Sequence, residues 1–507
     1  MRVTAFVATS LLFLHPATAA ASEPPEATVL VVTSADLEDA WLPFAAWKTA
    51  LGKRTKILST ESIAAEYEGR DLQEKIRVCI RHHVENFGTT AVILGGDSSP
   101  DGGVVPDRDT DHNTMWGPAA GIPTDIYYLS KGSWDADEDG KFGEWKDDAS
   151  AIDYPDGSVG LGRIPVRTAA DVSAFTAKVV SYESRYPEDA FAEEMIITCP
   201  VPQAYPKLKR SWDDHIAKAW TRGNGQQFFA DRTPWDKAVG GDFALSPQNW
   251  IELVNRKEVG KFHLHGHGLQ HCWVLENNAE LNLDGIQQLL NRDAYPVITT
   301  VSCFTGEFDA ENDPCIAEQM LRLPNAGAVI IVAPSREGKP HFHDPRTEFP
   351  LMMSEGKPDG TTLTMARFWA NGLGENIEAG RALMTAKAGM AEDARKSANF
   401  HLCLCELNLL GDPTLDLRAS NPRIAKASLP EKIAAERQVL KIQTNAPGAR
   451  VCAWKPGEVY VVAVSDGTGL ATIEIAPKTE GEMSLTVSGL GLNALSGSIQ
   501  VGSSNSK

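Results

Sequence analysis

The chain has 507 residues, of which 42% are hydrophobic and 23% are charged. This length and composition describe a globular protein with several buried cores, and they exclude a mainly disordered chain, a coiled coil and a collagen-like repeat. The 48 Lys and Arg residues against 67 Asp and Glu residues give a formal net charge of −19. An acidic chain gains nothing from counterion release, so we expect no nucleic-acid partner.

The first residues have the pattern of an export signal. Arg2 supplies a short positive region, Val3–Leu14 is an apolar stretch, and residues 17–19 (Ala-Thr-Ala) are the small residues typical of a cleavage site. The apolar stretch is too short to cross a bilayer, and no other part of the sequence has about 18 consecutive apolar residues. We therefore expect residues 1–21 to be a signal peptide and the mature protein to be secreted, periplasmic or bound to the cell surface, without a transmembrane segment.

From residue 28 onward, short apolar β-branched runs alternate with amphipathic stretches. Strand character is found in 28–34, 55–60, 91–97 and 158–166, and helical spacing in 39–51, 71–87 and 169–185. This alternation predicts a parallel sheet covered by helices on both faces, with its functional site at the carboxyl ends of the strands. Residues 98–156 are rich in Asp, Gly and Pro and predict a loop-rich section.

A second group of strand-like runs follows, and the pattern then changes. The later runs are 195–201, 260–268, 295–303, 325–335 and 401–415. After about Gln438 the sequence contains only short alternating or apolar runs separated by Gly, Pro and Asn, which predicts a small β-sandwich. We therefore expect an α/β unit in two subdomains, residues 22–190 and 191–420, followed by an all-β domain, residues 421–507.

Two segments place reactive side chains at the end of a predicted strand. One contains His267 and Gly268, and the other contains Cys303, 36 residues after the histidine. That separation allows one right-handed crossover through a helix near residues 283–290, so the two strand ends are neighbours if the strands pair. A thiol beside an imidazole supports nucleophilic acyl transfer, since the imidazole accepts the thiol proton and later protonates the leaving amine. The backbone N–H groups of Gly268 and Cys303 are candidates for binding the oxyanion.

These segments resemble the gingipain-type cysteine peptidases, which belong to the wider caspase-like group. The resemblance extends over about 28–501 and includes GHGLQHCW (266–273), TTVSCFTGEFD (299–309), TDIYYLSKGSWDADEDGKFGE (124–144), DGSVGLGRIPV (156–166) and LLGDPTLDL (409–417). It implies a caspase-like parallel-sheet catalytic unit followed by an immunoglobulin-like sandwich. It also implies endopeptidase activity on protein or peptide substrates.

The resemblance assigns roles to individual residues. His267 matches the family's catalytic histidine, Cys303 its nucleophile, and Trp273 an aromatic residue beside the substrate pocket. Ser302, directly before the nucleophile, is the second candidate substrate-binding residue. The expected catalytic set is therefore Cys303, His267 and Gly268, with no cofactor for catalysis.

One departure from the family pattern concerns the group that orients the histidine. In active gingipains an acidic residue shortly after a Gly-Arg motif has this role. Here Gly162 and Arg163 are followed by no acid until Asp171. This departure favours a second hypothesis, a catalytically inactive protein that keeps the peptidase fold for binding or surface assembly.

A third hypothesis is a zinc hydrolase. His263, His265 and His267 alternate along one predicted strand and therefore share a face, which is a metal-ligand pattern. The hypothesis requires further ligands downstream and leaves Cys303 and its glycine turn unexplained. The eight cysteines include no C-x-x-C pair, which excludes a zinc ribbon.

The loop-rich section contains a candidate calcium site. Asp135, Asp137 and Asp139, with Glu144, place oxygen ligands at alternate positions, and Gly140 allows a sharp turn. The loop is no EF-hand, because its twelfth position is Lys146. The resemblance implies calcium dependence, so we expect a structural calcium ion here; Asp107, Asp109 and Asp111 form a second acidic run.

Overall fold

The computed structural model describes residues 27–100, 103–111, 113–114, 117–118, 121–185, 194–198, 226–230, 246–275, 278–311, 314–338, 360–419 and 421–503. The predicted signal peptide lies outside these residues. Within the described ranges, no helix is both long enough and apolar enough to span a bilayer.

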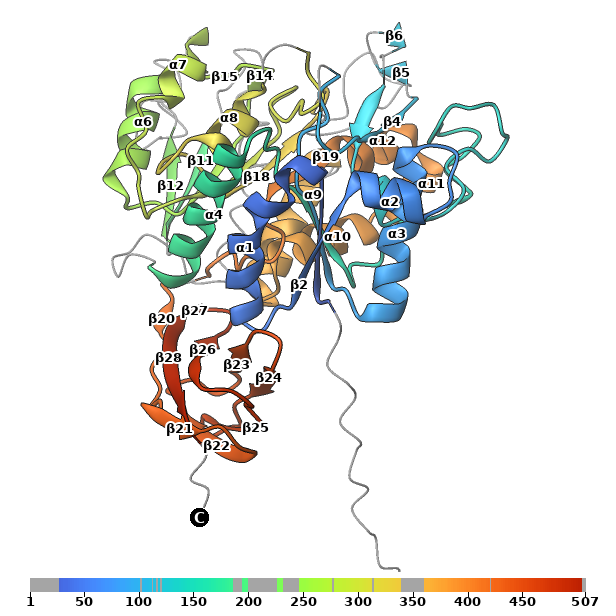
Figure 1. The fold of residues 1–507 in the computed structure, drawn as a ribbon. Coiled ribbons are helices and arrows are strands. Elements are labelled where there is room, and N and C mark those ends of the chain that lie inside the picture. Colours follow the sequence, from blue (N-terminus) through green and yellow to red (C-terminus); the bar gives the residue numbers. More distant parts are fainter. Residues whose placement is uncertain are drawn as a thin grey trace, which may run out of the picture.

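One ten-stranded sheet forms the centre of the α/β unit (Figure 1), in the order β12-β11-β13-β17-β18-β19-β10-β3-β1-β2. All neighbours are parallel except β18 and β19, which are antiparallel. The sheet therefore has two parallel blocks of opposite direction that meet at β18 and β19. Its strands are β1 (Val29–Thr33), β2 (Thr55–Ser59), β3 (Ala91–Leu94), β10 (Gly160–Arg163), β11 (Glu194–Thr198), β12 (Gln226–Ala230), β13 (Lys261–Leu264), β17 (Val297–Thr300), β18 (Ile330–Pro334) and β19 (Leu407–Gly411).

The central strands form because apolar and β-branched residues fill both of their faces. Every residue of β1, β3, β17 and β18 is buried. Helices cover both faces of the sheet, as expected for parallel strands (Figure 1). The helices are α1 (Glu38–Ala50), α2 (Thr60–Glu66), α3 (Leu72–Phe87), α4 (Ala169–Ser184), α6 (Pro247–Arg256), α7 (Leu283–Ile286), α8 (Ile316–Arg322), α9 (Gly360–Trp369), α10 (Ala379–Ala388), α11 (Ala391–Lys396) and α12 (Ala398–Glu406).

Local side chains fix the ends of the long helices. The Asp71 carboxylate accepts a hydrogen bond from the Glu74 N–H at the start of α3, and Gly88 ends that helix at φ 71°. At the start of α4, Thr168 and Asp171 form a capping box. Asp171, the first acid after the Gly162-Arg163 motif, is therefore engaged at a helix terminus.

Two predicted elements differ from the structure. The run 401–415 was expected to be a strand, but its first part lies in α12 and only Leu407–Gly411 is a strand. The helix expected over 283–290 is the single turn α7, Leu283–Ile286. The segment 401–406 shows no single apolar face because every one of its residues is buried, whereas 283–290 has helical spacing but its helix ends after one turn.

The C-terminal part is a β-sandwich with its own core. A five-stranded sheet, β21-β28-β26-β23-β24, packs on the pair β22–β25. Its core includes Val451, Ile473, Leu485 and Ile499. Its strands are β21 (Lys432–Ala434), β22 (Gln438–Gln443), β23 (Arg450–Lys455), β24 (Val459–Val464), β25 (Leu470–Ile475), β26 (Gly481–Ser488) and β28 (Leu495–Gly502), with β20 (Arg423–Ile424) paired to β27 (Leu492–Asn493) beside them.

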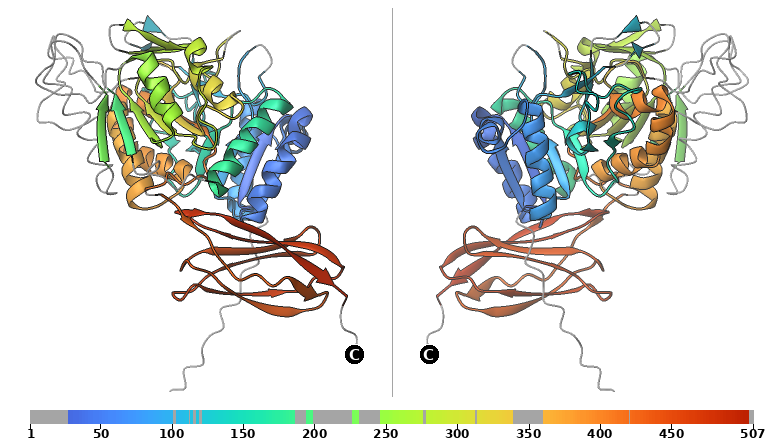
Figure 2. Two further views of the ribbon diagram at one scale, coloured as in Figure 1. Left: turned by 90° about the vertical axis from the view of Figure 1, so that its left-hand side faces the viewer. Right: turned by 90° about the vertical axis from the view of Figure 1, so that its right-hand side faces the viewer.

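The sandwich lies beneath one end of the α/β unit, as Figure 2 shows. It contacts the carboxyl end of α1, where the Ser488 hydroxyl donates to the Leu51 carbonyl at 3.1 Å and the Thr486 hydroxyl donates to the Ala50 carbonyl. Arg418 joins the two parts by donating to the carbonyls of Leu492 and Tyr182. These buried contacts hold the sandwich against the carboxyl end of α1.

Short elements complete the described chain. They are η1 (Ala35–Leu37), β4 (Arg108–Thr110), β5 (Asn113–Thr114), β6 (Gly117–Pro118), β7 (Ile122–Thr124), η2 (Ile126–Tyr128), β8 (Lys131–Gly132), β9 (Ile152–Asp153), β14 (His267–Leu269), β15 (Cys272–Val274), β16 (Glu280–Asn282) and the π-helical turn η5 (Ala370–Gly374). The three strands β14, β15 and β16 form a small antiparallel sheet directly after β13.

Candidate active site

The two segments with reactive side chains follow neighbouring strands. β13 and β17 are parallel, with Leu264 opposite Thr300, and the Val301 N–H donates to the Leu264 carbonyl at 3.1 Å. The segments that follow β13 and β17 therefore leave the sheet at the same edge. The pairing that the sequence argument required is present.

The glycine after His267 lies in close contact with the segment of Cys303. A Cβ atom at Gly268 would fall 2.7 Å from Thr305 Cγ2, 2.8 Å from Ser302 Cβ and 2.9 Å from the Cys303 carbonyl oxygen. Such distances leave no room for a side chain, so only glycine permits this approach. His267 itself is exposed at the start of β14, and Cys303 is half-buried. The structure thus brings the histidine segment and the cysteine segment together at Gly268, which packs against side-chain and backbone atoms of 302–305.

A tight turn presents Cys303 at the end of β17. The Thr305 hydroxyl donates to the Ser302 carbonyl at 2.8 Å, and Phe304 has a left-handed backbone with φ 60°. This conformation is strained for a bulky residue, and the surroundings must hold it. The Phe304 N–H donates to the Arg336 carbonyl at 2.7 Å, which anchors the turn to the segment after β18.

The Cys303 thiol is neutral at ordinary pH. Burial raises its pKa to about 11, and the buried Glu406 carboxylate contributes to the rise. The sulfur lies 3.8 Å from the Gly338 carbonyl oxygen. Because the thiolate is the reactive form, this site needs a base that removes the proton as the thiol reacts.

The three histidines do not share one strand face, so that expectation was wrong. β13 ends at Leu264, and the chain turns before it enters β14 at His267. His263 is fully buried, its Nδ1 lies 2.8 Å from Thr299 Oγ1, and burial lowers its pKa to about 3. Among the described residues, no group of three ligand atoms that could hold a metal ion contains any of these histidines. The zinc-hydrolase hypothesis therefore gains no support from the geometry.

Trp273 and Ser302 lie beneath the site. Trp273 is 0% exposed, and its indole N–H donates to Thr300 Oγ1 at 3.2 Å. The same hydroxyl accepts from the Ser302 N–H at 3.0 Å. This position differs from the pocket wall that the resemblance implies, because a ring without exposed surface supports the end of β17 from inside. Direct contact of Ser302 with substrate stays a prediction, since Ser302 is 1% exposed.

The Gly162-Arg163 motif has a structural role in this chain. The Arg163 guanidinium is buried, pairs with Asp125 at 2.6 Å and donates to the Gly96 and Val105 carbonyls. It also lies over the ring of Phe308, in the loop that follows Cys303. The motif thus supports the loop that follows Cys303, through the contact of Arg163 with Phe308. Asp171 has a different role, because it caps α4.

Sequence reasoning missed Arg336, which connects two loops of the site. Its guanidinium binds the Asp309 carboxylate at 2.6 Å and lies 3.6 Å from Glu307. Its carbonyl holds Phe304, as described above. Arg336 follows the predicted strand 325–335 directly, so its place at a strand end was a usable signal.

The predicted calcium ligands are only partly gathered. Asp135, Asp137 and Asp139 each have one carboxylate oxygen within 4.8 Å of the others. Glu144 is not in this group; its carboxylate lies 3.6 Å from Lys141 Nζ, which also binds Asp139 at 2.8 Å. Asp135 binds Arg70 at 2.6 Å. Three carboxylates therefore converge, and two basic side chains, Arg70 and Lys141, balance their charge. Asp107, Asp109 and Asp111 form no such group among the described residues.

Comparisons with known proteins agree with this architecture. The model of peptidase family C25 matches residues 22–418. Gingipain R2 of Porphyromonas gingivalis is 23% identical over 254 residues, which are 49% of this chain and 32% of gingipain R2. The chain thus matches about a third of the length of that relative.

Two solved structures share the fold over nearly the whole chain. The Arg-specific cysteine proteinase gingipain R (RgpB) superposes with a TM-score of 0.69 at 20% identity, covering 95% of this chain and 99% of that one. The complex of the Porphyromonas gingivalis RgpB pro- and mature domains gives 0.66 at 19% identity, with 94% and 100% covered. These likenesses confirm the predicted gingipain-like fold, an α/β unit followed by a β-sandwich. Because the family model covers most of its length, the chain belongs to peptidase family C25.

Proposed function

We propose that this protein is an exported cysteine endopeptidase in which Cys303 is the nucleophile and His267 carries the proton. The observation that supports this most directly is the contact of Gly268 with Ser302, Cys303 and Thr305, at 2.7 to 2.9 Å from a virtual Cβ. It makes the residue after His267 a neighbour of the cysteine. Membership of a peptidase family supplies the class of reaction.

The proposed reaction begins with a neutral thiol. His267 removes the proton from Cys303 Sγ while the sulfur attacks the peptide carbonyl carbon, and the backbone N–H groups of Gly268 and Cys303 bind the oxyanion. The imidazolium then protonates the leaving amine, and the C–N bond breaks. Water, activated by the same imidazole, attacks the thioester, and the C–S bond breaks to release the acid and the thiol.

Substitution of the two residues tests the proposal. Cys303→Ala should abolish hydrolysis of an internally quenched peptide with blocked termini, and His267→Ala should lower kcat/KM by about 10²- to 10⁴-fold. Matched controls are Cys79→Ala, whose buried thiol also has a pKa raised to about 11, and His82→Ala on exposed α3 surface. Unchanged turnover in Cys303→Ala would contradict the proposal.

A second candidate function is a binding protein that keeps the fold. It is favoured by Asp171, which caps α4 and is not available to orient a histidine. In this case a peptide-like electrophile would label Cys303 no faster than a simple alkylating agent does. Rapid labelling that requires His267 would exclude the binding-only function.

We propose export because Arg2, Val3–Leu14 and residues 17–19 have the pattern of a signal peptide. We expect the protein isolated from outside the cytoplasm to begin near residue 22. N-terminal sequencing of that protein checks this expectation, and an intact residue 1 would contradict it.

Calcium binding at Asp135, Asp137 and Asp139 is proposed as structural. The three carboxylates offer oxygen ligands that calcium prefers, and the ion would take over the charge balance now given by Arg70 and Lys141. We expect calcium to raise the melting temperature of the wild type and not that of Asp137→Asn/Asp139→Asn. An equal shift in both proteins would contradict a site in this loop.

A further inference from the structure

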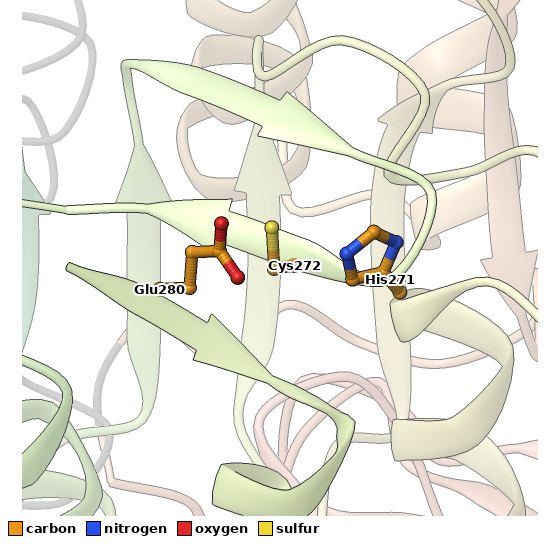
Figure 3. Close-up of side chains that lie close together, drawn as sticks. All are labelled: His271, Cys272 and Glu280. Atoms are coloured by element: carbon orange, nitrogen blue, oxygen red, sulfur yellow. The ribbon is translucent and has the colours of Figure 1, made fainter. Parts of the chain in front are cut away.

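The small antiparallel sheet that contains His267 has a second cluster of reactive side chains (Figure 3). His271 lies in the turn between β14 and β15, Cys272 begins β15, and Glu280 begins β16. Cys272 pairs with Leu269 on one side and Asn282 on the other, while Glu280 pairs with Val274. Since residues two apart in a strand share a face, Cys272 and Glu280 point to the same side of this sheet.

The three side chains converge. One ligand atom from each of His271, Cys272 and Glu280 lies within 4.8 Å of the other two. In Figure 3 the sulfur lies between the imidazole and the carboxylate. Cys272 is 0% exposed, whereas His271 and Glu280 are exposed. The two exposed side chains can therefore adjust around a fixed sulfur.

The chemistry of the three ligands selects the metal. A thiolate, an imidazole and a carboxylate are the ligands of Zn²⁺, which binds them at about 2.0 to 2.3 Å in a tetrahedral arrangement. Calcium and magnesium prefer oxygen ligands only, so the sulfur and nitrogen argue against them. Three protein ligands leave a fourth position for water on the exposed side.

We propose that His271, Cys272 and Glu280 bind one Zn²⁺ ion on the sheet that carries His267. The ion displaces the thiol proton and joins the β14–β15 turn, the central strand and the outer strand. It is distinct from the three-histidine hypothesis, because none of His263, His265 and His267 takes part. The site also does not depend on peptidase activity.

This position gives the ion a mechanical effect. Leu269, the cross-strand partner of Cys272, is two residues after His267 and directly after Gly268. A metal that joins β15, β16 and the turn after β14 restrains the end of β14 beside Gly268, which packs against the cysteine segment. Zinc should therefore stabilise the fold of this region.

The test uses the full chain with Cys303→Ala, so that the catalytic thiol does not bind zinc itself. The protein is stripped with a chelator and titrated with Zn²⁺ in excess calcium, so that the acidic loop at Asp135 does not compete. We expect one Zn²⁺ per chain and a higher melting temperature on binding. Co²⁺ in place of zinc should produce a thiolate-to-metal charge-transfer band in the near ultraviolet.

Substitutions assign the ligands. Glu280→Gln and His271→Ala change exposed side chains and should each weaken zinc binding by at least about tenfold, and Cys272→Ser should remove the charge-transfer band. His82→Ala is the matched control for a surface histidine. Three results would overturn the proposal. They are an unchanged zinc affinity in both surface variants, a charge-transfer band that persists in Cys272→Ser, and a site that binds Cu²⁺ but not Zn²⁺. Peptidase activity of the wild type is measured separately. Its loss would contradict the proposed peptidase function and would leave the zinc site untouched.

Discussion

At the scale of single residues, the site depends on a glycine and a thiol. Gly268 permits the approach of β14 to the cysteine turn, and burial raises the pKa of Cys303 to about 11. The sequence predicted both residues, because glycine turns and reactive side chains followed two strand-like runs. It did not predict the raised pKa, which arises from burial and from Glu406, a residue 103 positions away in the chain.

The contact of Gly268 can be tested by adding one methyl group. Gly268→Ala places a Cβ under 3.0 Å from Ser302, Cys303 and Thr305, so a backbone shift is required. We expect a loss of about 1 to 3 kcal/mol in the free energy of unfolding and a larger fractional loss of activity. Urea unfolding measures the first effect. Gly467→Ala, where nothing lies within 4 Å, is the control; equal effects of the two substitutions would contradict the packing argument.

At the scale of elements, strand ends and loops build the site. The runs that became β1, β3 and β18 were predictable because nearly all of their residues are apolar. The histidine segment was misread because alternation continued past Leu264, where β13 ends, and a period of two cannot show that the chain has left the sheet. The run 401–415 was misread because its burial continues unbroken from α12 into β19, so no period marks the change from helix to strand.

Glu307 connects the cysteine loop to Arg336, and its pKa gives a pH-dependent prediction. Burial raises that pKa to about 7, with Arg336 opposing and Asp309 adding to the rise. The fold therefore favours the protonated acid, and ionisation costs stability as pH increases from about 4.5 toward 7.

We expect Glu307→Gln to stabilise the protein at about pH 8 and to have little effect at about pH 4, where the acid is protonated in both states. Thermal unfolding at the two pH values measures this difference. Asp309→Asn should instead destabilise the protein, because it weakens the pair with Arg336. A larger gain for Glu307→Gln at low pH than at high pH would contradict the assignment.

At the scale of the whole molecule, two parallel blocks form one sheet and the sandwich closes one end of it. The sequence predicted the α/β unit from its alternating strand-like and helical runs, and the sandwich from the short runs that follow about Gln438. It could not predict that β19, from the end of the unit, joins β10 of the first block, because strand order depends on contacts between distant segments. Nor could it predict how the sandwich docks on α1.

The docking contact gives a prediction about stability. Thr486→Val keeps the side-chain shape but removes the hydroxyl that donates to the Ala50 carbonyl in the buried contact between α1 and the sandwich. We expect a loss of about 1 to 2 kcal/mol in the free energy of unfolding, measured in urea. Thr472→Val, on the exposed face of β25, should change it little. If the two variants were equally stable, this contact would contribute nothing to the docking.

The central claim is that Cys303 attacks a peptide carbonyl with proton transfer to His267. The most direct measurement is the rate at which a peptidyl electrophile labels the protein, followed by mass-spectrometric mapping of the modified residue. The account predicts a single adduct on Cys303 and a rate at least about a hundredfold lower in His267→Ala. An adduct on another residue, or an equal rate without His267, would contradict it.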